Sequence, residues 1–331
     1  MGKFSRAAVL ATAACGVLAV PVEAAAKTTL RLGTYVNEAD IRYRGFKKFA
    51  DLVAEKTQGR VTVQLFPSST LHGFNDGVDA ILSGISDISN VTFDNRLPCL
   101  RSTSLYPAPI DLKKQIDLDA AYTALLSKEA AAQNVVNVMS SNYSYDQEWW
   151  FKEPVRDLGK LGGKLVRSVG PLVTLMIEAW GGKAVFIAPK EIFQSAERGV
   201  VDGINMGVAT YSSWKMWEIM PYMVNANIFY GNVHYMMNKK KLDGLPPADQ
   251  KAVLDSGRET EIWLKPRYET WINEQVGDAV MRGNGSAISI SAAQSKALVA
   301  SVRPEWDKVV DKACGRDLAD KIRALFAQHA P

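Results

Sequence analysis

The sequence predicts an α/β protein made of two similar lobes, and three observations lead to this fold class. First, 331 residues exceed one typical hydrophobic core and suit about two domains of roughly 150 residues each. Second, predicted strands and helices alternate between residues 28 and 89, which is typical of a mostly parallel sheet covered by helices. Third, one strand–helix–strand phrase occurs twice, which favours two lobes that face each other.

The first predicted elements follow from local periodicity. Residues 28–34 (TTLRLGT) alternate like a strand, and residues 43–57 (YRGFKKFADLVAEKT) repeat apolar residues at helical spacing. A second strand follows at 60–66 (RVTVQLF), and Asn75 is suited to cap a helix that ends near Gly84. The apolar faces expected for the two helices are Phe46, Phe49, Ala50 and Val53, then Val78, Ile81, Leu82 and Ile85.

The repeated strand–helix–strand motif occurs in two distant parts of the chain. GRVTVQLFPSST with LSGISDIS, in residues 59–89, matches GKAVFIAPKEIF with ERGVVDGI, in residues 182–204. Each copy has a strand that ends at Pro, a helix, a Gly, and a short apolar strand that carries an Asp, at Asp87 and Asp202. The second copy follows a strand at 164–169, in which Arg167 interrupts an apolar pattern.

The remaining elements complete the expected lobes. Residues 248–281 read as one long helix that Pro266 should kink or interrupt. Closing helices follow at 292–310 and 317–327, and residues 148–152 and 230–235 are candidate crossings between lobes. The expected division is residues 27–147 with about 231–265 for one lobe, 148–230 with about 285–331 for the other, and a spanning helix over about 248–282.

The N-terminal residues 1–26 have the pattern of a secretory signal peptide. Two basic residues precede an apolar stretch over 7–20, and small residues follow it. The stretch is shorter than the roughly 20 residues that span a bilayer, and no later segment is apolar for that long. The mature chain should therefore begin near Ala25 or Lys27 and function outside the cytoplasm, without spanning the membrane.

The net charge and the cysteine content further restrict the possible classes of protein. The formal net charge of +4 is spread along the chain, which gives no footprint for nucleic-acid binding. Cys99 and Cys314 are the two cysteines beyond the signal segment. Outside the cytoplasm they are suited to a disulfide, but two buried free thiols fit the sequence equally well.

No spacing of catalytic or cofactor-binding residues stands out. His72, His234 and His329 are far apart, so a zinc site has no support, and there is no GxSxG or nucleotide-binding glycine loop. The sequence therefore predicts neither a metal nor a cofactor. A two-lobed α/β chain without catalytic spacing favours a protein that closes on a small molecule.

Several motifs follow one another along nearly all of the mature chain: EKTQGR before a strand and FPSSTLHG after it, ILSGISDIS, LGGKLVRSVG, KEIFQSAERGVVDGIN and MNKKKLDGLPPADQ. In this order they resemble the solute-binding proteins of tripartite ATP-independent periplasmic (TRAP) transporters, of the C4-dicarboxylate-binding type. The resemblance implies a two-lobed periplasmic binding protein fold with a hinge and a long spanning helix. It also implies a periplasmic protein that is not an enzyme and that delivers a carboxylate to a small and a large membrane permease subunit.

The resemblance also implies a ligand site. Arg167 matches the family's ligand arginine, whose planar guanidinium can pair with a carboxylate through two hydrogen bonds. Gln147 stands where some members carry a second basic residue. The other candidate ligand-binding residues are Tyr35, Asn37, Phe74, Asn75, Thr92, Phe93, Trp149, Asn205, Met206, Asn227 and Phe229.

The candidate pocket contains many aromatic residues, which favours a monocarboxylate with an aromatic or extended apolar body. A C4-dicarboxylate such as malate or succinate is the alternative ligand. Two other functions stay open from the sequence: a sensor-associated binding protein with the same fold, and a secreted hydrolase or lyase on a two-lobed scaffold. For Trp149 and its neighbours, the alternative role is packing in a hinge or core.

Overall fold

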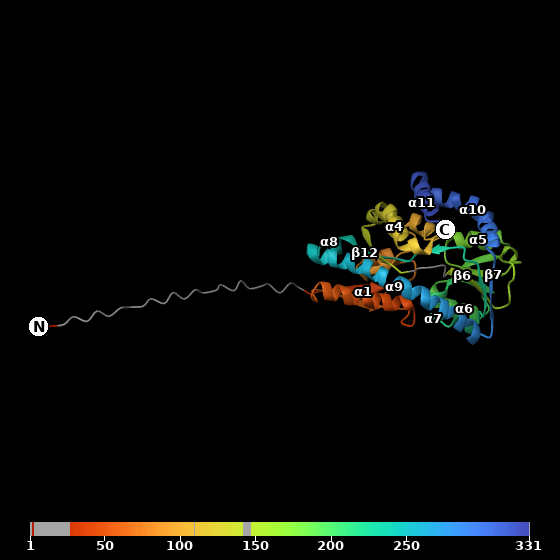
Figure 1. Cartoon of the computed structure of the whole chain (residues 1–331), viewed down its shortest axis with the longest axis horizontal. Helices are drawn as coiled ribbons and strands as arrows, with labels where there is room; N and C mark the ends of the chain where they lie inside the picture. The colour runs from red at the N-terminus through yellow and green to blue at the C-terminus, as the bar shows by residue number, and fades with distance from the viewer. Residues whose placement is uncertain (1, 3–26, 109, 142–146, 331) are drawn as a thin grey trace.

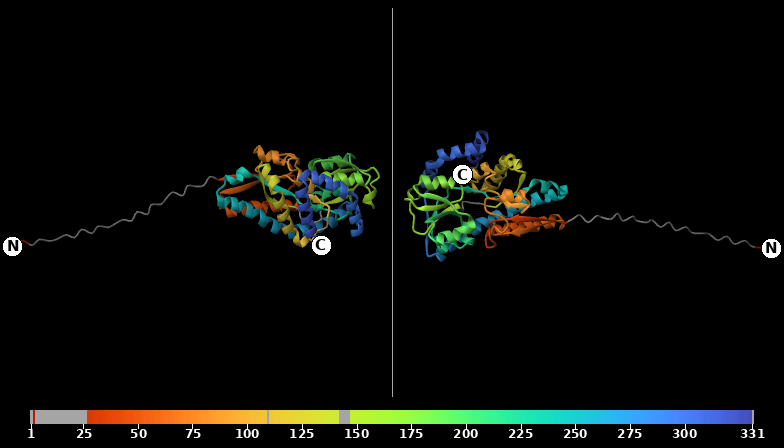
Figure 2. Two further views of the ribbon diagram at one scale, coloured as in Figure 1. Left: turned by 90° about the horizontal axis from the view of Figure 1, so that it is seen from above. Right: turned by 180° about the vertical axis from the view of Figure 1, so that it is seen from behind.

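The computed structural model describes residues 2, 27–108, 110–141 and 147–330. The predicted signal peptide therefore lies, apart from Gly2, outside the described residues. Within the described part of the chain, no helix is both long enough and apolar enough to cross a membrane. Two mixed sheets form the two lobes, and they lie side by side in every view (Figures 1 and 2).

The first lobe is built on a sheet with the strand order β2-β1-β3-β12-β5. The strand β1 runs parallel to β2 and β3, whereas β12 is antiparallel to β3 and β5. The strands of this sheet are β1 (Thr28–Gly33), β2 (Val61–Phe66), β3 (Ile88–Asn90), β5 (Val135–Ser140) and β12 (His234–Asn238). Its helices are α1 (Ile41–Lys56), α2 (Gly77–Leu82), α3 (Pro98–Thr103), α4 (Gln115–Ala132) and α8 (Lys239–Asp243).

The second lobe is built on a sheet with the order β13-β10-β6-β9-β7-β8. Its strands are β6 (Gln147–Phe151), β7 (Leu165–Ser168), β8 (Lys183–Phe186), β9 (Gly203–Gly207), β10 (Tyr222–Asn225) and β13 (Ser286–Ser289). Its helices are α5 (Pro171–Ala179), α6 (Pro189–Glu197) and α7 (Val208–Ser213). The small pair β4 (Leu105–Tyr106) and β11 (Tyr230–Gly231) and the 3₁₀ turns η1 (Leu112–Lys114), η2 (Leu158–Lys160) and η3 (Met216–Glu218) complete the connections.

The sequence repeat corresponds to a structural repeat. In each lobe the first parallel strand lies between the next two, as β2-β1-β3 and β8-β7-β9. Asp87 and Asp202 play the same part, because each carboxylate accepts a hydrogen bond of 2.8 Å from a backbone N–H on the neighbouring strand, at Arg31 and Leu165. The repeated Asp therefore fixes the start of a strand pair in both lobes.

The helix α9 (Pro247–Arg282) extends along both lobes (Figure 1). It packs against α1 and β5 in the first lobe and against α7 and β13 in the second. Gly257 allows the close approach to the first sheet, since a Cβ there would lie 1.9 Å from the carbonyl oxygen of Val138. One turn further, Glu261 accepts a 2.7 Å hydrogen bond from the backbone N–H of Ser140.

Several local expectations are corrected by the structure. The helix α9 continues through Pro266, so the expected interruption is wrong, whereas the expected kink stays a prediction; the carbonyl left without a donor belongs to the exposed residue Ile262, where water can reach it. The residue that caps α2 is Asp76 rather than Asn75. Residues 148–152 are no crossing, since most of them form the buried strand β6. Trp149 and Trp150 project from opposite faces of that strand into two separate hydrophobic clusters.

The C-terminal helices α10 (Ala292–Cys314) and α11 (Arg316–Gln328) contact both lobes. The helix α10 packs on α3 and α5, and α11 packs on α4. Cys99 in α3 and Cys314 at the end of α10 form a disulfide, which decides between the two readings that the sequence left open. The exact division of the chain into lobes stays a prediction.

Candidate ligand-binding site

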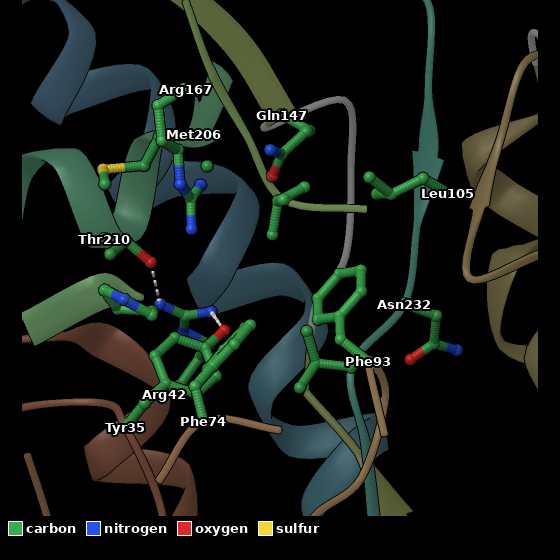
Figure 3. Close-up of a pocket in the computed structure, with 14 residues that line it drawn as sticks. Tyr35, Arg42, Phe74, Phe93, Leu105, Gln147, Arg167, Met206, Thr210 and Asn232 are labelled. Atoms are coloured by element: carbon green, nitrogen blue, oxygen red, sulfur yellow. Dashed lines mark hydrogen bonds between the residues drawn. The ribbon is translucent and has the colours of Figure 1, made fainter. Parts of the chain in front are cut away.

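A cavity lies between the lobes and contains about 460 Å³ of space not filled by atoms, part of it open to solvent (Figure 3). Its walls come from segments far apart in the sequence. They are Tyr35, Arg42, Phe74, Phe93, Leu105, Asn232 and Val233 from the first lobe and the crossing before β12, and Gln147, Arg167, Val169, Pro189, Met206, Gly207 and Thr210 from the second lobe. A hollow lined mainly by apolar and aromatic side chains with a few polar groups is typical of small-molecule sites.

Arg167 is the central cation of this cavity. It lies near the C-terminal end of β7, where parallel strands commonly present ligand-binding residues. Its Nε donates to the carbonyl of Ile187 at 3.0 Å and its Nη1 donates to the carbonyl of Asn205 at 2.8 Å. These two bonds fix the plane of the guanidinium, which points into the cavity in Figure 3.

The charge of Arg167 has no carboxylate partner within 4.0 Å among the described residues. The side chain is 2% exposed, and burial lowers its pKa to about 9, although the nearby Tyr35 raises it. At neutral pH the guanidinium therefore keeps its charge while it lacks an anion. A buried charge without a partner is costly, and an anionic ligand relieves that cost.

A second arginine, Arg42, lines the same cavity but is already neutralised. Both Nε, at 2.9 Å, and Nη2 donate to the carboxylate of Asp40, which caps the start of α1. Burial disfavours the charge of Arg42, but Asp40 and Tyr35 more than compensate, so its pKa stands well above the ordinary value. Arg42 also joins the lobes, because Nη2 donates to the Thr210 hydroxyl at 2.8 Å.

One feature of the sequence could have identified Arg42 as a site residue. It falls on the same helical face as Phe46 and Phe49, at spacings of four and seven residues, where a charge is unexpected. A charged residue on the apolar face of a helix needs a partner or a cavity, and Arg42 has both. Thr210 and Asn232 gave no comparable signal.

Aromatic side chains form one wall of the cavity. The Phe74 and Phe93 rings stack with centroids 5.4 Å apart and an interplanar angle of 27°, and Tyr35 meets Phe74 edge-on at 5.0 Å. The Tyr35 hydroxyl accepts a 2.8 Å hydrogen bond from Nη1 of Arg42. This wall is therefore aromatic and apolar, with one polar group at the Tyr35 hydroxyl.

The structure brings some of the predicted residues to the cavity and leaves others outside it. Those that line the cavity are Tyr35, Phe74, Phe93, Gln147, Arg167 and Met206. Trp149 and Phe229 instead pack with each other in the core, with ring centroids 6.3 Å apart. Asn227 borders a separate hollow beside the start of α10.

The other predicted amide and hydroxyl groups have structural partners or places away from the cavity. Asn205 lies behind the wall, where its oxygen accepts a 2.6 Å hydrogen bond from Gln147 and its Nδ2 donates to the carbonyl of Glu148. Asn37 donates to the carbonyl of Ser213 at 2.9 Å, so it joins the lobes beside Arg42. Thr92 accepts a 2.7 Å hydrogen bond from the backbone of β12, and Asn75 precedes the cap of α2.

The sequence matches a known protein family and known individual proteins. The family model for bacterial extracellular solute-binding proteins, family 7 (DctP), matches residues 32–313. A solute-binding protein of Verminephrobacter eiseniae is 24% identical over an alignment of 309 residues that covers 88% of each chain.

Solved structures of similar fold cover almost the whole chain. The Bordetella pertussis extracytoplasmic solute receptor DctP7, which binds pyroglutamic acid, has a TM-score of 0.80 at 22% identity, over 91% of this chain and 99% of that one. A TRAP periplasmic solute-binding protein from Desulfovibrio salexigens, with bound orotic acid, has a TM-score of 0.82 at 19% identity, over 92% of this chain and 100% of that one. At these sequence identities the solved structures support only the fold. The family model matches most of the sequence and therefore shows the family. The chain therefore belongs to family 7 of the bacterial extracellular solute-binding proteins, which are binding proteins and not enzymes.

Proposed function

We propose that this protein captures an organic monocarboxylate in the periplasm and delivers it to the small and large membrane subunits of a TRAP permease. Family membership supports the periplasmic location and the permease partners. The observation that carries the ligand class is the buried guanidinium of Arg167, which faces the cavity without a carboxylate partner among the described residues.

The charge balance of the cavity supports one carboxylate rather than two. Arg42 is compensated by Asp40, so Arg167 is the single uncompensated cation among the cavity-lining residues that the structure describes. A second ligand carboxylate would have to be buried without a cation of its own, which is unfavourable. A C4-dicarboxylate is therefore the less favoured ligand.

The aromatic wall supports a ligand with an apolar or ring-bearing body. Phe74 and Phe93 line the cavity with rings that stack on each other at an interplanar angle of 27°, and aromatic side chains favour contact with such a body. The acids named for the two structural neighbours, pyroglutamic acid and orotic acid, are both cyclic monocarboxylic acids. They are suitable first probes for this chain.

The test compares Arg167→Ala with the wild-type protein against a panel of monocarboxylates and dicarboxylates. Thermal shift identifies the acids that bind, and calorimetry measures their affinity. Removing one member of a buried charge pair typically costs enough to lower affinity about 100-fold, so Arg167→Ala should lose tight binding while its circular dichroism stays native.

The matched control is Arg267→Ala. Arg267 is an exposed arginine that lies over the ring of Trp263 on α9 at 4.3 Å, and it is not among the residues that line the cavity. Its removal should leave affinity unchanged. Tight binding of the same acid by Arg167→Ala would contradict the assigned role of Arg167.

A further inference from the structure

We propose that the ligand carries an N–H or O–H donor in addition to its carboxylate, and that the side-chain oxygen of Asn232 accepts a hydrogen bond from it. This inference rests on the proposed carboxylate site and specifies the neutral part of the same ligand. It makes Asn232 a specificity-determining residue.

Asn232 lies between β11 and β12, where the chain crosses from one lobe to the other. Its side chain lines the cavity and is only 2% exposed. Its Nδ2 donates to the Tyr230 hydroxyl oxygen at 3.0 Å. In contrast, its Oδ1 is buried and accepts no hydrogen bond from any described residue.

The orientation of this amide is fixed by its neighbours. The Tyr230 hydroxyl donates its single proton to the carboxylate of the buried Asp119, so its oxygen is left to accept from Asn232. Burial raises the pKa of Asp119, whereas hydrogen bonds from Tyr230 and Asn232 lower it. The nitrogen of Asn232 therefore faces Tyr230 and Asp119, and the oxygen faces the cavity, as drawn in Figure 3.

The side-chain amide of Gln147, which also lines the cavity, is oriented by its neighbour Asn205. Asn205 uses its nitrogen on the Glu148 carbonyl, so its oxygen must accept from the nitrogen of Gln147. The oxygen of Gln147 is then left with no partner among the described residues. The neutral part of the cavity thus presents two amide oxygens, which accept but cannot donate.

An acceptor that stays unpaired when the cavity closes loses its hydrogen bond to water without replacement, which weakens binding about 10- to 100-fold. A ligand with a matching donor avoids this cost, whereas an ether oxygen or a C–H group in the same place does not. The structure thus points to hydroxy acids or acids with a ring N–H, and against a wholly apolar aromatic acid.

The experiment uses pairs of acids that differ in one donor, measured by calorimetry on the mature protein. Pyrrole-2-carboxylate is compared with furan-2-carboxylate, and pyroglutamate with its lactone analogue, because ring oxygen replaces ring N–H in each pair. A third pair is the tightest-binding acid of the thermal-shift panel and its donor-blocked methyl derivative. The donor-bearing acid should bind about 10- to 100-fold more tightly.

Two variants link this preference to the residue. Asn232→Leu keeps a similar volume without the acceptor, and Asn232→Ala serves if the leucine variant does not fold. In either variant the preference should fall to within about threefold, while the effect of Arg167→Ala on acid binding persists.

The outcomes separate this inference from the proposed function. If no acid binds, the carboxylate role of Arg167 fails, and this inference fails with it. If acids bind but donor-free members bind equally well, or if the tightest ligand has no donor, only the role of Asn232 is overturned. A preference that survives in both Asn232 variants would overturn it as well.

Discussion

At the scale of single residues, the cavity contains two arginines whose electrostatic states differ. Arg167 donates only to neutral carbonyls, whereas Arg42 is held by the carboxylate of Asp40. The first is therefore available to an anion, and the second mainly organises the hydroxyls of Tyr35 and Thr210. If the proposed site is correct, Asp40 limits the charge of the ligand by compensating Arg42.

Asp40→Asn should shift ligand preference toward dicarboxylates. Asn retains the N-cap of α1 and a similar shape, but it leaves the charge of Arg42 uncompensated in a buried cavity. We expect the affinity for succinate or malate to rise about tenfold or more relative to a monocarboxylate of the same length. Calorimetry on both acids measures this ratio.

The control for this substitution lies on the same helix. Asp51 is exposed on α1, away from the cavity, so Asp51→Asn makes the same chemical change without altering the site. An unchanged dicarboxylate-to-monocarboxylate ratio in Asp40→Asn would show that Asp40 does not set the charge of the ligand.

At the scale of elements, β12 combines structural and ligand-site roles. It is the strand that returns the chain to the first sheet, and it begins with the buried His234 directly after two cavity residues. Burial lowers the pKa of His234 to about 3, and its Nδ1 has no hydrogen-bond partner among the described residues. His234 is thus folded as the neutral imidazole.

This burial predicts a pH dependence of stability. The unfolded chain takes up a proton on His234 below about pH 6.5, whereas the folded protein does so only near pH 3. Stability due to this residue is therefore lost as the pH falls through that window, by at most about 1.4 kcal/mol per pH unit. His234→Gln removes this term.

Urea unfolding of both proteins between about pH 8 and pH 5 tests the sign. The free energy of unfolding of the wild type, minus that of His234→Gln, should stay constant above about pH 7.5 and decrease below about pH 6.5. Buried acids such as Asp119 and Glu261 are present in both proteins, so their opposite contributions cancel in this difference. A difference that increases on acidification would exclude a buried neutral His234.

At the scale of the whole molecule, three connections hold the lobes in register. The helix α9 extends along both sheets, Arg42 and Asn37 reach the second lobe through hydrogen bonds, and α10 returns to the first lobe. The disulfide between Cys99 and Cys314 links positions 215 residues apart, so it closes a loop over about two thirds of the 331-residue chain.

Replacing both cysteines with serine should lower the free energy of unfolding by about 2–5 kcal/mol. The reason is that the loop closed by the disulfide is long, and its removal gives the unfolded chain more freedom. Denaturation under non-reducing conditions measures the loss. Dithiothreitol should destabilise the wild type to the level of the double variant and leave the double variant unaffected, and equal stability of the two oxidised proteins would contradict the prediction.

The sequence by itself determined the alternating elements and the internal repeat, and the resemblance of its motifs singled out Arg167 as a candidate ligand residue. These features depend on local periodicity or on short motifs, and the strand orders β2-β1-β3 and β8-β7-β9 confirm the repeat. Trp149 and Phe229 were placed in the pocket by their residue type alone, but the pleat of β6 directs Trp149 into the core.

Only the tertiary structure decided which side chains share the cavity and which charges are already paired. Arg42 meets Thr210 across 168 residues of sequence, and the orientation of Asn232 depends on Asp119, which lies on another element. The disulfide likewise requires two distant helices to meet. Such contacts follow from how the lobes pack, and packing joins segments whose local sequence patterns carry no information about each other.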